Sequence, residues 1–190
     1  MSGDSPNYYA HGADDNDLDL LNRLKKLIRI LIKEKKYSYN RVLSTADYFI
    51  DRWERAAFMG FGEGSSVYDS CLVLGDVKVG KNTWIGPYTI LDGSGGGLEI
   101  GDNCNISAGV HIYTHDTVGH VINGDPIAQS PVRIGNNVYI GPHSVIAKGV
   151  SIGDFVVIGA CSLVLSSIPY GMKAFGTPAK IVGKSINEER

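Results

Sequence analysis

The sequence has little of what a membrane protein, an exported protein or a nucleic-acid-binding protein requires. It contains no apolar run long enough to span a bilayer. Its first residues lack the basic and apolar regions of a signal peptide. The net charge of -2 provides no overall basic field that would attract nucleic acid. We therefore expect a cytoplasmic protein without a nucleic-acid partner.

Cysteine is also scarce. The three cysteines, Cys71, Cys104 and Cys161, do not show the paired spacing of a metal site. Cys71 and Cys104 fall on inward positions of the repeat described next. We expect small buried thiols in a reducing cytoplasm.

An aliphatic residue returns every six positions over much of the chain. A period of six fits neither an amphipathic helix nor a half-buried strand, so it indicates a supersecondary repeat in which each unit is a short strand and a turn. We call each unit a hexad. The repeating residues are Val73, Val79, Ile85, Leu91, Ile100, Ile106, Ile112, Ile134, Ile140, Ile146, Ile152, Ile158 and Val164.

The other hexad positions indicate how the units stack. Glycine usually follows the aliphatic residue, as at Gly80, Gly135 and Gly153, where a tight corner tolerates little bulk. A second small or apolar residue comes four places after each aliphatic one, so each hexad directs two side chains into a narrow tube. Three hexads closing one coil, with each coil buried on the next, is the simplest solenoid that this spacing allows.

The repeats at Ile134-Gly-Asn-Asn-Val-Tyr, Ile140-Gly-Pro-His-Ser-Val and Ile152-Gly-Asp-Phe-Val-Val resemble those of the hexapeptide-repeat acyltransferases. The resemblance covers roughly residues 67–185. It implies a mainly β fold, a left-handed parallel β-helix, and a homotrimer as the working unit.

The chain divides into three predicted regions. Residues 1–16 are polar and acidic, and we expect them to be disordered. Residues 17–62 form a helical segment with one helix from Asp17 and a second from near Ser44 to Met59. Residues 63–190 form the β-helix domain. The basic first helix could lie on a membrane or pack on the solenoid or a neighbouring subunit, and packing is favoured because the helix has acidic residues and a second helix as partners.

The repeat is broken twice. The hexad of Leu91 contains three extra residues within 92–97, and about sixteen extra residues, 116–131, separate the hexad of Ile112 from that of Ile134. We call residues 92–97 the first break and residues 116–131 the second break. Counting three hexads per coil puts Leu91 and Ile112 on one face, one coil apart. Both breaks are therefore expected to be neighbours, with Asp92 close to His115.

The segment His111-Ile-Tyr-Thr-His115-Asp, followed by a long insertion, resembles the catalytic-loop region of sugar acetyltransferases such as the galactoside and maltose enzymes. The resemblance implies that His115 is the general base of a direct attack on acetyl-CoA, without an acyl-enzyme. An imidazole, with a reference pKa of about 6.5, suits this role at cytoplasmic pH. Asp92 is a candidate to bind the acceptor or to orient His115. Tyr113 could stack on the acceptor, and Asp116 could orient His115 or begin the loop.

Other functional interpretations are weaker. His111 and His143 are alternative histidines, but His143 occupies an outward position of a regular hexad. A metal site of His111, His115 and Asp116 is not expected, because adjacent coil positions diverge and the family's chemistry requires no metal. The glycine-rich first break is not a phosphate-binding loop, since it lacks the Lys-Ser/Thr and the helix that such a loop needs.

Gly176-Thr-Pro178-Ala-Lys180-Ile-Val resembles the segment that ends the family's coenzyme A site, which lies in a groove between adjacent subunits. The sequence departs from the family at Leu165-Ser166, where many relatives have Thr-Lys, and Lys148 or Lys173 is the alternative phosphate contact. The resemblance implies that the backbone amides near Gly159 and Ala160 hold the pantetheine arm and that Lys180 meets the nucleotide phosphates. The residues carried over to this groove are Tyr139, Gly141, Gly159, Ala160 and Lys180.

The sequence therefore predicts a CoA-dependent acetyltransferase that modifies a hydroxyl or amine of a sugar or nucleotide-sugar, in surface polysaccharide biosynthesis. The alternatives are acetylation of another small molecule, such as serine or an antibiotic, and a non-catalytic hexapeptide scaffold. A relative of the hexapeptide carbonic anhydrases would need three metal-binding histidines, and the regular coils do not supply their spacing.

Overall fold

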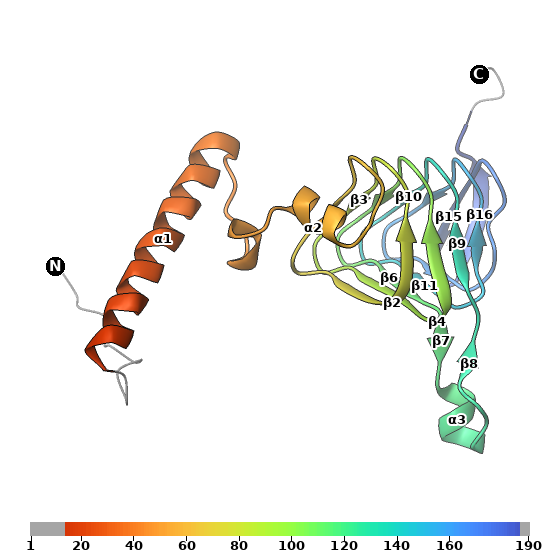
Figure 1. Cartoon of the computed structure of the whole chain (residues 1–190). Coiled ribbons are helices and arrows are strands. Elements are labelled where there is room, and N and C mark those ends of the chain that lie inside the picture. The colour runs from red at the N-terminus through yellow and green to blue at the C-terminus, as the bar shows by residue number, and fades with distance from the viewer. Residues whose placement is uncertain (1–13, 187–190) are drawn as a thin grey trace. The chain divides into compact units, whose positions relative to one another are not determined.

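The computed structural model describes residues 14–186, which fall into two compact units divided between Phe49 and Ile50 (Figure 1). The predicted disordered segment 1–16 lies mostly outside the described residues. Each unit is described below by itself. No helix within residues 14–186 has the length and apolar composition needed to cross a membrane.

The first unit contains one long helix, α1 (Asp15–Tyr39), and the short 3₁₀ helix η1 (Ala46–Tyr48). The helix begins two residues before its predicted start, because the Asp14 side chain accepts hydrogen bonds from the amides of Asn16 and Asp17 in a capping box. Asn40 ends the helix in the left-handed conformation that commonly terminates helices.

The predicted second helix from Ser44 to Met59 is wrong in extent. Asp51 interrupts it, because its side chain accepts hydrogen bonds from the amides of Trp53 and Glu54 and so starts a new helix, α2 (Arg52–Phe58). The chain divides before this helix, which packs on the first strand of the second unit. Ala56 of α2 joins the hydrophobic core. α2 therefore covers the N-terminal end of the solenoid (Figure 1).

The second unit is a coil of short parallel strands. One face is a sheet whose strands follow each other along the tube. It contains β1 (Ser66–Val67), β3 (Trp84–Ile85), β5 (Asn105–Ile106), β10 (Tyr139–Ile140), β13 (Val157–Ile158), β15 (Met172–Gly176) and β16 (Ala179–Lys184). All neighbours in this sheet are parallel except β15 and β16, which form an antiparallel hairpin at its C-terminal edge.

A second sheet supplies the two other faces. The strand β4 (Ile90–Ile100) continues around a corner, pairing through its first residues with β6 (His111–Tyr113) and through its last residues with β9 (Val132–Ile134). β2 (Leu72–Val79) follows the same path one coil earlier. The remaining strands are β11 (Val145–Ile146), β12 (Ser151–Ile152) and β14 (Leu163–Val164).

The register confirms the predicted coil of three hexads. Arg133 pairs with Ser151, 18 residues further along the chain. The spacing rises to 21 residues where Leu91 pairs with Ile112, and to 34 where Ile112 pairs with Ile146. The three extra residues of the first break and the sixteen of the second therefore leave the ladder intact and bulge from its corners.

The repeated aliphatic side chains fill the tube, as predicted. Ile85, Leu91, Ile106, Ile112 and Ile140 are fully buried. Burial at two such positions per hexad, at about 25 cal/mol per Å² of apolar surface, is the main favourable term that holds the coils together.

The cysteines follow the prediction in part. Cys71 and Cys104 are buried at inward positions, and burial raises the pKa of the Cys104 thiol. The expectation is wrong for Cys161, which is exposed at a corner where the backbone adopts a positive φ of 55°.

Two neighbouring residues test whether the repeated aliphatic side chains point into the tube. Ile152 is buried, whereas the Ser151 side chain is exposed. We expect Ile152→Ala to lower the free energy of unfolding by about 2–5 kcal/mol, through lost burial and a cavity. The matched change Ser151→Ala is expected to cost less than about 0.5 kcal/mol. Urea unfolding measures both, and equal losses would contradict the placement.

Candidate active site

The two breaks of the repeat lie against each other, as the hexad count predicts. Asp92 pairs in register with Tyr113. The buried Thr114 hydroxyl donates a 2.8 Å hydrogen bond to the Asp92 carbonyl and accepts one of 2.8 Å from the amide of Gly95. These bonds fasten the first break to the residue that precedes His115.

His115 is held by a buried carboxylate. Its Nδ1 lies 3.2 Å from Oδ2 of Asp92, whose side chain is 5% exposed, whereas the His115 side chain is 33% exposed. The amide and hydroxyl of Ser94 donate hydrogen bonds to Oδ1 of Asp92, and the hydroxyl lies 3.4 Å from Nδ1 of His115. A carboxylate that accepts the Nδ1 proton keeps the imidazole in the tautomer whose Nε2 can accept a proton.

The surroundings of the Asp92 carboxylate bear on the two roles predicted for it. Because its carboxylate is buried and faces Ser94 and His115, it is placed to orient the imidazole rather than to contact an acceptor in solvent. Tyr113 is half-buried and packs edge-to-face on His111, with the phenol oxygen 3.4 Å from Nδ1 of that ring. Its ring is therefore engaged with His111.

Asp116 is paired with a lysine at the start of the loop. Its carboxylate lies 2.9 Å from the ammonium of Lys148 and accepts a hydrogen bond from the amide of Val118, so it begins the loop. The hydrogen bond from Lys148 is the largest influence that lowers the pKa of Asp116. Lys148 is thus paired at the base of the loop. Lys173 is exposed on β15.

The second break forms a small arm. Two short antiparallel strands, β7 (His115–Asp116) and β8 (Ala128–Gln129), make a stalk that carries α3 (Val118–Asn123). Figure 1 shows the arm projecting from the coils. Val121 and Ile122 on α3 are 73% and 74% exposed. A small helix with apolar side chains in solvent is suited to contact another molecule.

The residues predicted to bind coenzyme A do not join His115 within one chain. Tyr139 lies on β10, and Gly141, Gly159 and Ala160 lie at the corner that follows the first sheet. His115 follows β6, at the next corner around the tube. Lys180 is exposed on β16. The structure brings together Asp92, Tyr113 and His115, and it leaves the predicted coenzyme A residues on a different edge.

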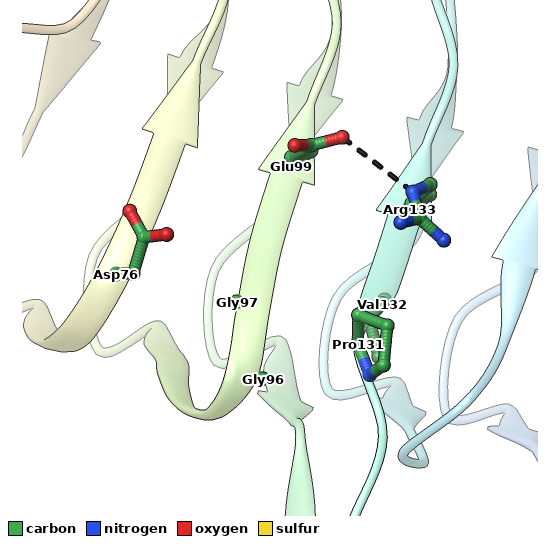
Figure 2. Close-up of a pocket in the computed structure, with 7 residues that line it drawn as sticks. All are labelled: Asp76, Gly96, Gly97, Glu99, Pro131, Val132 and Arg133. Atoms are coloured by element: carbon green, nitrogen blue, oxygen red, sulfur yellow. Dashed lines mark ion pairs between the residues drawn. The ribbon is translucent and has the colours of Figure 1, made fainter.

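A small hollow opens beside the first break, on the face formed by the last residues of β2 and β4 and by β9. It has a volume of about 40 Å³ and lies between β2, β4 and β9 (Figure 2). The Arg133 guanidinium pairs with Glu99 at 3.6 Å across its rim. Gly96 lies next to Pro131, the last residue of the second break. The hollow is therefore polar and adjoins the site, although its size admits only a small chemical group. Its lining residues are Asp76, Gly96, Gly97, Glu99, Pro131, Val132 and Arg133.

Sequence reasoning missed Thr114 and the position of Lys148. A threonine between two aliphatic hexads resembles an ordinary inward residue, and only the contact across coils reveals that it joins the two breaks. Lys148 lies outside both breaks and meets Asp116 through the fold. Among residues 14–186, no group of three or more His, Cys, Asp or Glu side chains is arranged to hold a metal ion.

Comparisons with known proteins agree with this architecture. The family model described as "Bacterial transferase hexapeptide (six repeats)" matches residues 131–166, and "Hexapeptide repeat of succinyl-transferase" matches residues 76–114. The structure of the N-acyltransferase AntD from Bacillus cereus, in complex with dTDP and 3-hydroxybutyryl-CoA, is similar with a TM-score of 0.60 and 30% identity, covering 65% of this chain and 71% of that one. The chain belongs to the hexapeptide-repeat acyltransferase family.

Two further relatives are sugar acetyltransferases. The galactoside O-acetyltransferase of Escherichia coli (strain K12) is 32% identical over 132 residues, which cover 58% of this chain and 64% of that enzyme. A maltose O-acetyltransferase from Clostridium difficile 630 has a similar structure, with a TM-score of 0.57, 27% identity and coverage of 92% and 90%. The chain spans just under two thirds of the length of the galactoside enzyme.

The close approach of Gly95 to His115 gives a structural prediction. A Cβ at Gly95 would lie 2.3 Å from the Thr114 carbonyl oxygen and 2.7 Å from Cβ of His115. Gly95→Ala is therefore expected to separate His115 Nδ1 from Asp92 Oδ2 to more than about 3.5 Å, beyond hydrogen-bond range. A crystal structure of the variant measures this distance.

Gly119→Ala in α3 is the control. Its Cβ would meet the flexible end of the Asp125 side chain at 3.0 Å, which can move aside. The control should keep the pair near 3.2 Å. An unchanged pair in Gly95→Ala would contradict the tight packing of the two breaks.

Proposed function

We propose that the chain is a CoA-dependent acetyltransferase that acts on a hydroxyl or amine of a sugar or nucleotide-sugar. The active form would be a homotrimer of left-handed β-helices. The observation that carries the proposal is the His115–Asp92 pair, 3.2 Å apart, at the point where both breaks of the repeat meet. A rigid scaffold that bears its irregular segments at one spot is a typical arrangement of a functional site.

In the proposed reaction, Nε2 of His115 accepts the proton of the acceptor hydroxyl or amine as the acceptor attacks the thioester carbonyl. The new carbon–oxygen or carbon–nitrogen bond gives a tetrahedral intermediate. Its collapse breaks the carbon–sulfur bond, and the imidazolium returns the proton to the leaving CoA sulfur. Asp92 holds the Nδ1 proton throughout and stabilises the imidazolium. General-base help of this kind contributes about 10²- to 10⁴-fold.

The placement of the predicted coenzyme A residues supports a site between subunits. Tyr139, Gly141 and Ala160 lie at a different corner of the tube from His115. A thioester bound by these residues would therefore not reach the imidazole of the same chain. A neighbouring β-helix in a trimer would present them, with Lys180 as a point charge for the nucleotide phosphates. The apolar residues of α3 would contact the neighbouring subunit.

The relatives support a saccharide acceptor. AntD is an N-acyltransferase crystallised with dTDP-linked sugar, dTDP and CoA ligands, whereas the galactoside and maltose enzymes transfer acetyl to oxygen. We propose a nucleotide-linked or saccharide unit used for a surface polysaccharide and acetylated in the cytoplasm. Both amine and hydroxyl acceptors fit the chemistry of a neutral imidazole base.

Removal of the base tests the catalytic assignment. We expect His115→Ala to lower the rate of thiol release from acetyl-CoA, with a panel of nucleotide-activated amino sugars and free saccharides, by about 10²- to 10⁴-fold. His120→Gln, which alters a histidine exposed on α3, is the control and should retain activity. Equal activity of His115→Ala and wild type would refute His115 as base, and no thiol release by wild type with any acceptor would favour a non-catalytic scaffold.

Asp92→Asn separates orientation from acceptor binding. An asparagine keeps the shape but loses the charge that stabilises the imidazolium, so we expect kcat to fall about 10- to 100-fold with little change in the KM of the acceptor. Ser94→Ala, which removes one donor to Asp92, should have a smaller effect in the same direction. A raised KM with unchanged kcat in Asp92→Asn would instead indicate direct contact with the acceptor.

A further inference from the structure

The helix α1 carries an apolar face that its own unit, through η1, covers only in part. None of its residues is buried, and Leu20, Leu24 and Leu27 are 62%, 44% and 46% exposed. At about 100° per residue, Leu18 and Ile30 lie outside, whereas seven other apolar side chains of α1 fall within one arc of about 140°. They are Leu20, Leu21, Leu24, Leu27, Ile28, Leu31 and Ile32.

The opposite face of α1 is basic. Lys35 falls in the apolar arc near the C-terminal end of the helix, and the cationic residues outside that arc are Arg23, Lys25, Lys26, Arg29, Lys33 and Lys36. The acidic residues near the start, such as Asp15 and Asp17, belong to the first turn, where they favour the positive end of the helix dipole. The stretch from residue 23 to residue 33 contains no Asp or Glu. The middle of the helix thus combines an apolar face with a positively charged one.

Two observations weaken packing on another helix. The long second helix predicted as a partner does not form, since residues 44–59 give η1 and the short α2 instead, and α2 packs on β1 in the other unit. The apolar arc is also wider than the two-position seam of a coiled coil. Leu21, Leu24, Ile28 and Leu31 could form such a seam, but the flanking leucines and Ile32 broaden the face beyond it.

We propose that α1 lies in the interface of an anionic phospholipid membrane and holds the enzyme at that surface. Leu24, Ile28 and Leu31 enter the boundary between head groups and acyl chains, and Lys26 and Arg29 remain among the phosphates. An amphipathic helix with a wide apolar face and Lys and Arg opposite to it has the composition of a helix that lies in this plane. The proposal concerns location and does not rest on the catalytic proposal above.

The test uses the full-length chain and sedimentation with lipid vesicles. We expect binding to vesicles of phosphatidylcholine mixed with phosphatidylglycerol, and much weaker binding to phosphatidylcholine alone. Added salt should reduce binding to the anionic vesicles, since it screens the charge attraction. Absence of binding to the anionic vesicles at low salt would overturn the proposal.

Two variants divide the contributions of the two faces. Lys26→Gln with Arg29→Gln keeps helix propensity and should weaken binding to anionic vesicles about 30-fold, or about fivefold for each charge. Leu24→Gln with Leu31→Gln should weaken it by about tenfold for each leucine. Asn22→Gln, a neutral change on the polar face, should bind as wild type does.

Light scattering and thermal unfolding distinguish membrane contact from protein contact. All variants should keep the wild-type mass and unfolding midpoint in vesicle-free buffer. If the double leucine change instead dissociates the oligomer or lowers the midpoint while vesicle binding stays as in wild type, α1 packs on protein and the proposal is wrong. Thiol release in the same buffer reports separately on catalysis, so failure of either proposal is recognised by itself.

Discussion

Closure of each coil in eighteen residues is the constraint on which the second unit depends. A parallel strand can pair with the coils before and after it only if all coils return to the same register, as Arg133 does with Ser151. Extra residues therefore have to leave at a corner. Both breaks leave beside β6, one coil apart, and the ladder resumes after each. This exclusion of irregular segments from the tube brings Asp92 and His115 to one place.

The same constraint explains how much the sequence predicts. The hexad period is strictly local, so counting alone places Leu91 opposite Ile112 and brings Asp92 close to His115. Counting says nothing about which way a corner side chain turns. The burial of Asp92, the bonds of Thr114 and the pairing of Asp116 with Lys148 all depend on contacts between coils. Cys161 was misjudged for the same reason, since it occupies a corner rather than an inward position.

The N-terminal segment was harder to predict because its pattern is weaker. Apolar spacing from Ala46 to Ala57 suits one helix, but the aspartate at position 51 caps a helix of its own and competes with continuation. A cap contributes about 1 kcal/mol, which is enough to move a boundary where no tertiary contact opposes it. The division at Phe49 follows, leaving α1 in a unit separate from the β-helix. The prediction of a helix at α1 is confirmed. Its apolar spacing is regular over about seven turns, and Asp14 supplies the N-cap that starts it.

The strands at the two edges of the first sheet have different neighbours from the strands in its middle. At one edge, β1 lies against α2. At the other edge, β16 pairs antiparallel with β15. A stack of identical parallel coils would otherwise offer an unpaired backbone edge, onto which a further copy could add without limit. Because α2 and the antiparallel strand β16 occupy these edges, neither edge offers a further copy the parallel strand of a regular coil. They oppose end-to-end growth into fibrils, so association through the sides of the tube is favoured over polymerisation along its axis.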